Sequence, residues 1–413
     1  MKIITLDEIT FDKYTKTHKY RNYYQTSAYG KVMKNNNCNI HYIGIIDDNN
    51  NLLGASLILY KEVFMNYKIA YAPRGILFDY TNLENLTEFT TRLKKLLSKQ
   101  GFMSLKIDPL IPVNLRNKDG KIININKEAN IILENLKANN YDYLGPNLFF
   151  EAEKPRFETL VVLDKDIKDI YQDFDKNIRY KIKKAIRSGV EIYKGNKEQL
   201  KEFYEFVKKK YNRPINYYID LFDNFSPNVD LYFAKLNTET FVITSRVQYE
   251  KELEINNNLA IEIQNNKNNK LKKKIINKKI ESDNLVNVYK KNLVWATNLL
   301  KTYPTGLFIG TSLNINYDNA SYLVIEGFNQ QFRSLNPSYL IKWKMINDYK
   351  NKNFKYVNLN AISGEFNKIN KYTGLNEMKL GFGSLITEYI GEFELIINNL
   401  PYNLYKNLNK NKK

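Results

Sequence analysis

The sequence of 413 residues contains one cysteine, Cys38, and only two histidines, His18 and His41. A single cysteine can form neither a disulfide within the chain nor a cysteine-rich metal site, so we expect a reducing, cytoplasmic environment and no bound metal. Nucleophilic triads and zinc sites commonly use histidine, and its scarcity argues against both. Either histidine could still serve a triad, although a lone histidine beside a strand is more often structural.

Long apolar runs are also missing. No window approaches the roughly 20 apolar residues of a membrane-spanning helix, and the segment Met1 to Glu8 is too polar for a signal peptide. We therefore expect any contact with a membrane to occur at its surface, on the inner face. The chain has no Gly-x-x-x-x-Gly-Lys-Ser/Thr loop, which excludes a P-loop nucleotide hydrolase. No cofactor is predicted.

Basic residues outnumber acidic ones, with 63 Lys and Arg against 44 Asp and Glu and a formal net charge of +19. Such a protein accumulates near polyanions such as nucleic acid, anionic lipid head groups or phosphorylated substrates. A solvated lysine-rich surface, encoded by an AT-rich genome, explains the composition equally well. The hydrophobic content of 43% is sufficient for two or three cores.

The same order of predicted elements occurs twice along the chain. The first copy has a hairpin, a strand, a helix and a strand, over residues 42–60, 69–71, 86–99 and 102–108. The second copy has the same elements over residues 232–249, 322–325, 337–350 and 354–360. The duplication predicts two α/β lobes, each with its own core.

The second copy is longer by roughly 62 residues, which fall in a run without glycine or proline from Arg246 to Tyr303. Apolar residues recur there at helical spacing, so the simplest fit is an antiparallel helical hairpin, or coiled-coil arm, with its tip within residues 264–283. Seven lysines near the tip form either a solvated surface or a contact for nucleic acid or lipid head groups: Lys267, Lys270, Lys272, Lys273, Lys274, Lys278 and Lys279.

These patterns divide the chain as follows. The first lobe is predicted over residues 1–152, the second over 153–245 and 304–392, and the arm over 246–303. A C-terminal segment, 393–413, is predicted to pack back on the first lobe.

Four motifs follow one another along the chain: Tyr71-Ala72-Pro73-Arg74-Gly75 with Asp79, Lys106-Ile107-Asp108-Pro109, Asn177 to Ala185 with Ser188-Gly189-Val190, and Thr373-Gly374-Leu375 with Met378 to Gly383. Together with the helical insertion, their order resembles the Fem family of peptidoglycan bridge-forming aminoacyltransferases, over nearly the whole chain. Met378 stands where the family pattern usually has an aromatic residue.

The resemblance implies two acetyltransferase-like (GNAT-like) lobes, the second bearing the arm. It also implies the reaction, in which an amino acid passes from aminoacyl-tRNA to an amino group of the stem peptide of a peptidoglycan precursor, lipid-linked or nucleotide-linked. An aminoacyl ester is already activated, so the enzyme needs only to align the amine and stabilise the oxyanion. The amino acid transferred, its position in the bridge and the oligomeric state are left open.

Both implied substrates carry phosphate groups, so fixed cations are expected in the site. By resemblance, Lys31, Arg213 and Tyr217 are favoured for the precursor. Pro214 biases Arg213 toward extended backbone and ends the preceding helix, although a helix-terminal arginine can also simply complement the helix dipole. Three further residues are predicted to bind substrate: Tyr71, Arg74 and Tyr322.

Two residues are predicted to be catalytic. Lys379 precedes Gly381-Phe382-Gly383, where glycines would let the backbone approach a ligand, so the lysine could meet a developing negative charge or the tRNA terminal phosphate. The alternative is an ordinary strand-edge lysine. Asp108 could be a general base, and its counterpart in the second copy is Asn360. Asp-Pro is also a common turn, and solvent or substrate phosphate could accept the proton instead.

Two rival functions remain open. One is a coenzyme-A-dependent N-acyltransferase, although the glycine-rich turn that binds pyrophosphate in such enzymes precedes neither predicted helix. The other is a non-catalytic nucleic-acid-binding protein that uses the basic arm.

Overall fold

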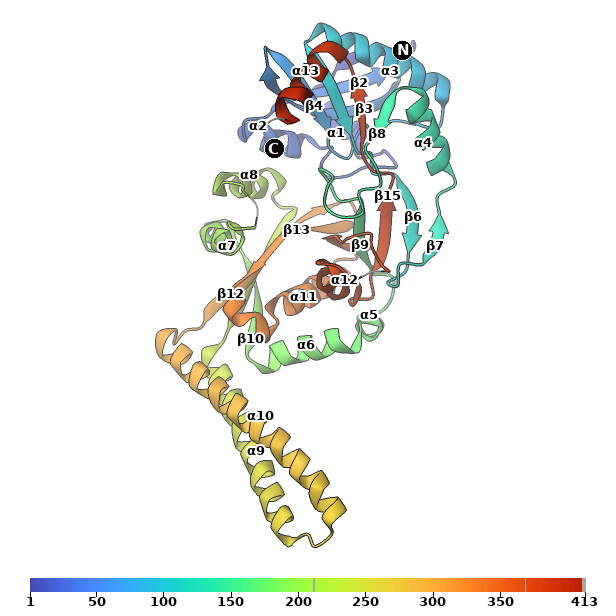
Figure 1. The fold of residues 1–413 in the computed structure, drawn as a ribbon. Coiled ribbons are helices and arrows are strands. Elements are labelled where there is room, and N and C mark those ends of the chain that lie inside the picture. Colours follow the sequence, from blue (N-terminus) through green and yellow to red (C-terminus); the bar gives the residue numbers. More distant parts are fainter. Residues whose placement is uncertain (211, 368, 411–413) are drawn as a thin grey trace.

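The computed structural model describes residues 1–210, 212–367 and 369–410. Figure 1 shows two lobes stacked on one another and a pair of long helices that projects from the second. A seven-stranded sheet forms the first lobe and a nine-stranded sheet the second. This arrangement confirms the two predicted α/β lobes with a helical arm. None of the helices in the described ranges combines the length and apolar character needed to cross a bilayer.

The first sheet has the strand order β1 (Lys2–Thr5), β2 (Asn39–Ile46), β3 (Leu52–Phe64), β4 (Tyr67–Ala72), β5 (Phe102–Ile107), β16 (Phe393–Ile396) and β8 (Tyr141–Tyr143). The helices of this lobe are α1 (Glu8–Thr15), α2 (Ser27–Asn35), α3 (Leu83–Lys99) and α4 (Glu128–Ala138).

Helix α3 covers one face of the first sheet. Asn82 caps its N-terminus by accepting a hydrogen bond from the backbone N–H of Asn85. Its buried residues Leu86, Phe89 and Leu93 recur at helical spacing and pack against apolar side chains of the sheet, such as Ala70. The opposite face of β4 and β5 is left free for a pocket.

The second sheet has the order β10 (Val190–Gly195), β11 (Val229–Leu236), β12 (Leu307–Tyr317), β13 (Ala320–Phe328), β14 (Tyr356–Ala361), β9 (Phe157–Val162), β15 (Leu385–Tyr389), β6 (Pro112–Arg116) and β7 (Ile122–Ile125). Its helices are α5 (Ile167–Asp173), α6 (Lys176–Arg187), α7 (Leu200–Val207), α8 (Ile215–Phe225), α11 (Pro337–Asn351) and α12 (Thr373–Leu380).

The duplication is visible in the strand pairing. In the first lobe β2, β3 and β4 pair antiparallel and β4 then pairs parallel with β5, after the crossover helix α3. In the second lobe β11, β12 and β13 pair antiparallel and β13 pairs parallel with β14, after α11. The repeated order predicted from the sequence is therefore present.

The predicted hairpin over 232–249 is wrong in its second half. Strand β11 ends at Leu236, and the chain enters helix α9 (Thr238–Asn265), while the partner strand β12 follows the arm. Phe241 and Val242, which suggested a strand, belong to a helical stripe that packs near Trp295 of helix α10 (Asn269–Thr302). The arm thus begins before Arg246, and its tip lies between Asn265 and Asn269, inside the predicted interval.

The two lobes exchange strands. β6 and β7, which were predicted to belong to the first lobe, extend the second sheet, where Arg116 forms an ion pair with Glu388 of β15 at 2.6 Å. Conversely, β16 lies between β5 and β8 of the first sheet, and helix α13 (Asn399–Lys410) packs near β5. Residues 411–413 of the predicted C-terminal segment lie outside the described residues. The exchange fixes the lobes against one another.

Candidate active site

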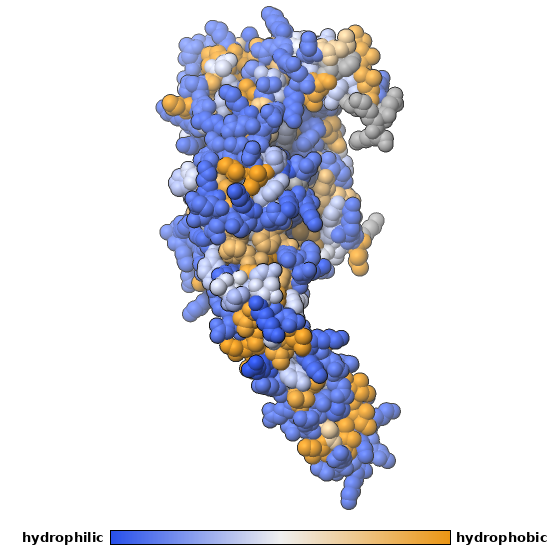
Figure 2. Space-filling model, turned by 90° about the vertical axis from the view of Figure 1, so that its left-hand side faces the viewer, coloured by the Kyte–Doolittle hydropathy of each residue, from blue (hydrophilic) through white to orange (hydrophobic). Residues whose placement is uncertain are grey.

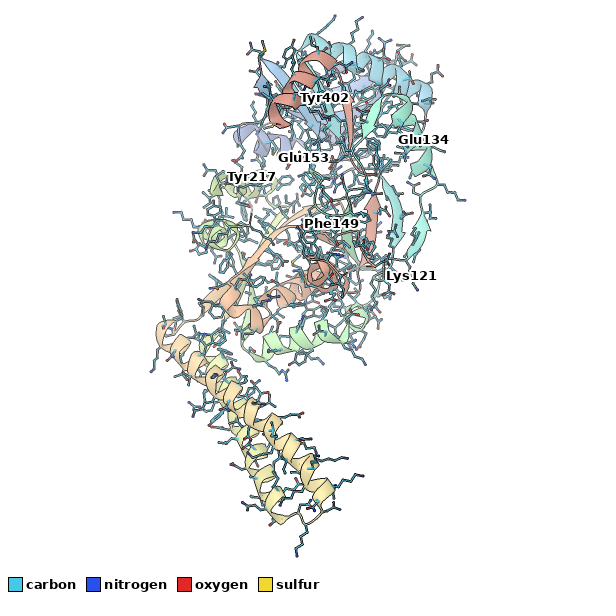
Figure 3. All side chains as sticks on the ribbon, viewed as in Figure 1. Lys121, Glu134, Phe149, Glu153, Tyr217 and Tyr402 are labelled. Carbon is cyan, nitrogen blue, oxygen red and sulfur yellow. The ribbon has the colours of Figure 1, made fainter. Side chains whose placement is uncertain are left out.

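A pocket of about 650 Å³ lies on the face of the first sheet opposite α3, at the junction of the lobes. Side chains on this face come from neighbouring strands in register: Leu59 pairs with Tyr71, Tyr71 with Lys106, and Lys106 with Glu394. Helix α2 contributes Tyr29 and helix α13 contributes Tyr402. Figure 3 shows Tyr217 on α8, with Glu153 and Tyr402 beyond it on the side of the first lobe.

The pocket is rich in positive charge. Two carboxylates line it, Glu153 and Glu394, against five cations: Lys61, Lys106, Lys154, Arg213 and Lys406. Burial lowers the pKa of Lys154 to about 8, and its Nζ lies 4.2 Å from the centre of the Tyr24 ring. The excess of cations makes the pocket suitable for a phosphorylated ligand.

Arg213 and Tyr217 lie together, with Arg213 in the loop after helix α7 and Tyr217 in the first turn of α8 rather than in that loop. Helix α7 ends at Val207, and Pro214 adopts an extended conformation before α8. The Arg213 guanidinium carbon lies 4.2 Å from the centre of the Tyr217 ring, which stacks it in place at the edge of the pocket. Tyr217 itself is buried.

Lys31 occupies a different position. Helix α2 turns Tyr29 and Met33 toward the pocket, whereas the Lys31 Nζ pairs with a Glu8 oxygen at 2.7 Å. Both partners are about half exposed, and such surface pairs contribute at most ~1 kcal/mol. The lysine can leave Glu8 at low cost, and its contact with a diphosphate stays a prediction.

Asp108 and Arg74 form a buried cluster beneath the pocket. The Asp108 carboxylate accepts hydrogen bonds from the Tyr71 hydroxyl at 3.0 Å and from the Arg74 backbone N–H at 2.6 Å. Burial raises the pKa of Asp108 to about 6, although the Arg74 guanidinium opposes the rise. Tyr71, which lines the pocket, therefore connects the ligand space to a carboxylate that titrates near neutrality.

The side chain of Arg74 bridges the lobes. One of its guanidinium nitrogens donates to Glu158 of β9 at 2.6 Å, and the other lies 3.7 Å from Asp108. Arg74 and Tyr322 also line a cavity of about 20 Å³, enough for about one water molecule. The structure thus places both residues at the contact between lobes, and direct binding of a substrate by either stays a prediction.

Lys379 lies in the last turn of α12, so the alternative of a strand-edge lysine is wrong. Its side chain is buried, its Nζ donates to the Ala361 carbonyl at 2.7 Å, and burial lowers its pKa to about 7. A Cβ on Gly381 would lie 2.6 Å from Ile178, so the close packing of helix α6 requires this glycine. Approach of a ligand to the backbone at Gly381 and Gly383 stays a prediction.

A buried ion pair beside Lys379 was not found by sequence analysis. Lys342 of α11 is fully buried and pairs with Glu326 of β13, and the Lys210 Nζ donates to the Glu326 carbonyl at 3.0 Å. The charge of Glu326 raises the pKa of Lys379, while Lys342 and Lys210 lower it. The sequence signal that could have revealed this pair is the position of Lys342 between Ile341 and Met345, within the apolar stripe of α11.

The two predicted catalytic residues belong to different lobes. A chain of contacts connects them. Lys379 donates to the carbonyl of Ala361, and Ala361 lies opposite Glu158 on the neighbouring strand. Glu158 in turn forms an ion pair with Arg74, which lies beside Asp108. A second pocket, of about 400 Å³, lies near Lys379 and is lined by Glu326 and Met378. Among the described residues, no group of three or more His, Cys, Asp and Glu side chains is arranged to hold a metal ion.

Comparison with known proteins agrees with this architecture. The FemAB family model matches residues 6–410. The aminoacyltransferase FemA of Staphylococcus epidermidis is 25% identical over 430 residues and covers 100% of both chains, and that of a Staphylococcus aureus strain is 26% identical over 428 residues and 99% of both. The crystal structure of FemX superposes with a TM-score of 0.71 at 20% identity, covering 98% of this chain and 99% of that one. The protein described here belongs to the FemAB family.

Proposed function

We propose that the protein transfers an amino acid from aminoacyl-tRNA to an amino group on the stem peptide of a peptidoglycan precursor. The observation that carries the proposal is the cation-lined pocket at the lobe junction of a FemAB family member. The names of its relatives, aminoacyltransferases FemA, support the reaction class.

The first lobe would bind the precursor. A diphosphate placed in the pocket would meet Arg213, which stacking on Tyr217 holds in one orientation, and Lys154. Because the pKa of Lys154 is about 8, a bound anion would favour its protonated, charged form. Because guanidinium groups bind phosphate through two parallel hydrogen bonds, Arg213 would contribute more than any single lysine of the pocket.

The reaction requires little beyond alignment and charge. The acceptor amine attacks the ester carbonyl, an amide bond forms, the ester C–O bond breaks, and the terminal ribose hydroxyl of the tRNA leaves with a proton. We assign Lys379 to the developing oxyanion, because it is a buried lysine of the second lobe that donates to a backbone carbonyl, whereas the buried Lys342 is paired with Glu326. We assign Asp108 to removal of a proton from the acceptor ammonium, which yields the amine that attacks.

The test is transfer of radiolabel from aminoacyl-tRNA to purified precursor. We expect transfer that ribonuclease treatment abolishes and that Arg213→Ala reduces at low precursor concentration. Arg92→Ala, which removes an exposed arginine paired with Glu88, is the matched control and should behave as wild type. Transfer that depends on acetyl-coenzyme A instead would support the rival N-acyltransferase and contradict the proposal.

A further inference from the structure

The C-terminal helix α13 presents an apolar stripe to solvent. Leu400, Leu404 and Leu408 are 75%, 49% and 49% exposed. Their spacing of four residues places them along one face of the helix. Single exposed leucines are common on protein surfaces, whereas three aligned on one short helix form a patch that fits an apolar partner.

The remainder of α13 is tied to the first lobe. Pro401 is buried, the Tyr402 hydroxyl donates to Glu394 at 2.7 Å, and Tyr405 and Lys406 line the 650 Å³ pocket. The helix is therefore a wall of the pocket, with its leucines on the outside. Figure 1 shows α13 at the end of the molecule opposite the arm, and Figure 2 shows orange patches on the same lobe within a mostly hydrophilic surface.

Positive charge accompanies the stripe. Lys406 lies on α13 itself, and Lys61 and Lys106 line the pocket beside it. An amphipathic helix that combines leucines with nearby lysines is suited to lie in the interface of a bilayer that carries anionic lipids.

We propose that α13 docks the protein on an anionic membrane surface, with the mouth of the pocket beside the bilayer. The proposal deepens the proposed function and rests on it in one respect: if the pocket takes the diphosphate of a precursor, docking places that pocket where a lipid-linked acceptor presents its own diphosphate.

A second copy of the chain fits the stripe less well. Stable interfaces bury about 800 Å² on each partner, far more than three partly exposed leucines offer. The outer part of the arm also exposes apolar side chains, such as Ile261, Leu271 and Ile280. However, it lies at the far end of the molecule from the pocket, so docking there would hold the pocket away from the membrane.

Sedimentation with vesicles tests the docking. The full chain is mixed with vesicles of phosphatidylcholine alone or of phosphatidylcholine with phosphatidylglycerol. We expect binding to the anionic vesicles, and a loss on the order of 10-fold or more for the triple variant Leu400→Gln, Leu404→Gln, Leu408→Gln. The matched control Ile261→Gln, Leu271→Gln, Ile280→Gln should bind as wild type, and thermal melting should show both variants folded.

Three results would overturn the proposal. They are equal binding of the leucine variant and wild type, equal binding to neutral and anionic vesicles, and a dimer in solution that the leucine substitutions dissociate, which would assign the stripe to a second copy.

Label transfer to two acceptors separates this inference from the proposed function. The leucine variant should match wild type with a soluble nucleotide-linked precursor and lose activity with a lipid-linked precursor in vesicles. Equal activity of the two proteins on the vesicle-bound acceptor would contradict docking by α13. Absence of transfer by wild type to both acceptors would refute the proposed function, while vesicle binding would still decide the docking.

Discussion

The parallel strands β4 and β5 of the first lobe correspond to β13 and β14 of the second, and the residues near their ends differ. In the first lobe Asp108 is a buried carboxylate that accepts hydrogen bonds from Tyr71 and Arg74. At the equivalent place Asn360 donates its amide hydrogen to the Leu323 carbonyl. Asp108 therefore carries a titratable charge, whereas Asn360 supplies a hydrogen bond to a backbone carbonyl.

The crossover helices differ in the same way. Helix α3 buries only apolar residues and one threonine against its sheet, whereas α11 buries Lys342, paired with Glu326 near Lys379. One scaffold thus carries a buried carboxylate with a basic pocket in one lobe and a cluster of buried lysines in the other. We infer a division of labour in which the first lobe binds the acceptor and the second acts on the donor ester.

The largest expected effect concerns the bridge between the lobes. Glu158→Ala should lower the free energy of unfolding by ~3–5 kcal/mol, because it leaves the buried Arg74 with only the more distant Asp108 as counter-ion. Urea unfolding measures the change, and Glu134→Ala, which breaks the exposed pair with Lys137, is the control with an effect within ~0.5 kcal/mol. A loss below ~1 kcal/mol for Glu158→Ala would show that the lobes do not depend on this contact.

Lys379→Ala should lower turnover by roughly 100- to 1,000-fold, the usual cost of removing a preorganised oxyanion donor, with a much smaller change in the Michaelis constant. Lys344→Ala, which removes a partly exposed lysine paired with Asp348, should leave both constants near wild type. If Lys379→Ala raised only the Michaelis constant, the residue would bind substrate and the second lobe would lose its proposed role.

Arg213→Ala should weaken precursor binding by ~1.5–3 kcal/mol, measured by calorimetry, if the guanidinium makes a charge-assisted hydrogen bond to the diphosphate. Arg213→Lys should also lose affinity, since an ammonium cannot reproduce the two-pronged contact. Lys31→Ala should have a similar effect only if the lysine leaves Glu8 on binding. Unchanged affinity in all three variants would place the precursor elsewhere.

The pH profile of turnover distinguishes the role of Asp108 in the first lobe from that of Lys379 in the second. Asp108 acts as a base in its ionised form, so activity should rise as pH increases through about 6, and Lys379 acts as a cation, so activity should fall as pH increases through about 7. Asp108→Asn should flatten the acid limb and reduce turnover less than Lys379→Ala, because solvent can replace a base. Greater damage from Asp108→Asn at every pH would reverse the two roles.

Shortening the arm should have the smallest effect on the lobes. The corresponding hairpin of the first lobe joins β2 to β3 through a short turn near Asp47. Replacing residues 250–290 by a short glycine-serine linker keeps Phe241 and Trp295 in the core and should change the free energy of unfolding of the lobes by less than ~1 kcal/mol. Loss of cooperative unfolding would show that the arm is part of the second core.

Much of the fold was predictable because duplicated order, apolar spacing and the absence of glycine and proline are local signals. The first hairpin, α3 and β5 were predicted correctly. The apolar residues of α3 recur at helical spacing, which is a signal that the sequence alone shows. The return strand of the second hairpin was not predicted correctly, because the arm separates β11 from β12 by the length of two helices. The transfer of β6 and β7 to the second sheet was missed, because the spacing of residues along the chain does not show which sheet edge a strand joins. The return of residues 393–396, as strand β16, to the first lobe agrees with the predicted packing of the C-terminal segment.

The site was predictable only in part. Pro214 allowed the end of the helix before Arg213 to be predicted, whereas the stacking of Arg213 on Tyr217 of α8 became visible only in the structure. The roles of Arg74 and Lys379 depend on burial: Arg74 meets Glu158, which lies far along the chain, and Lys379 meets a backbone carbonyl. Nothing local to either residue distinguishes an exposed cation from a buried one.

The most direct test of the division of labour is a crystal structure of the complex with a nucleotide-linked precursor. The account predicts diphosphate oxygens within ~3 Å of the Arg213 guanidinium, in the pocket of the first lobe, and a stem-peptide amine directed toward the second lobe. A diphosphate bound instead in the 400 Å³ pocket beside Met378 would contradict it.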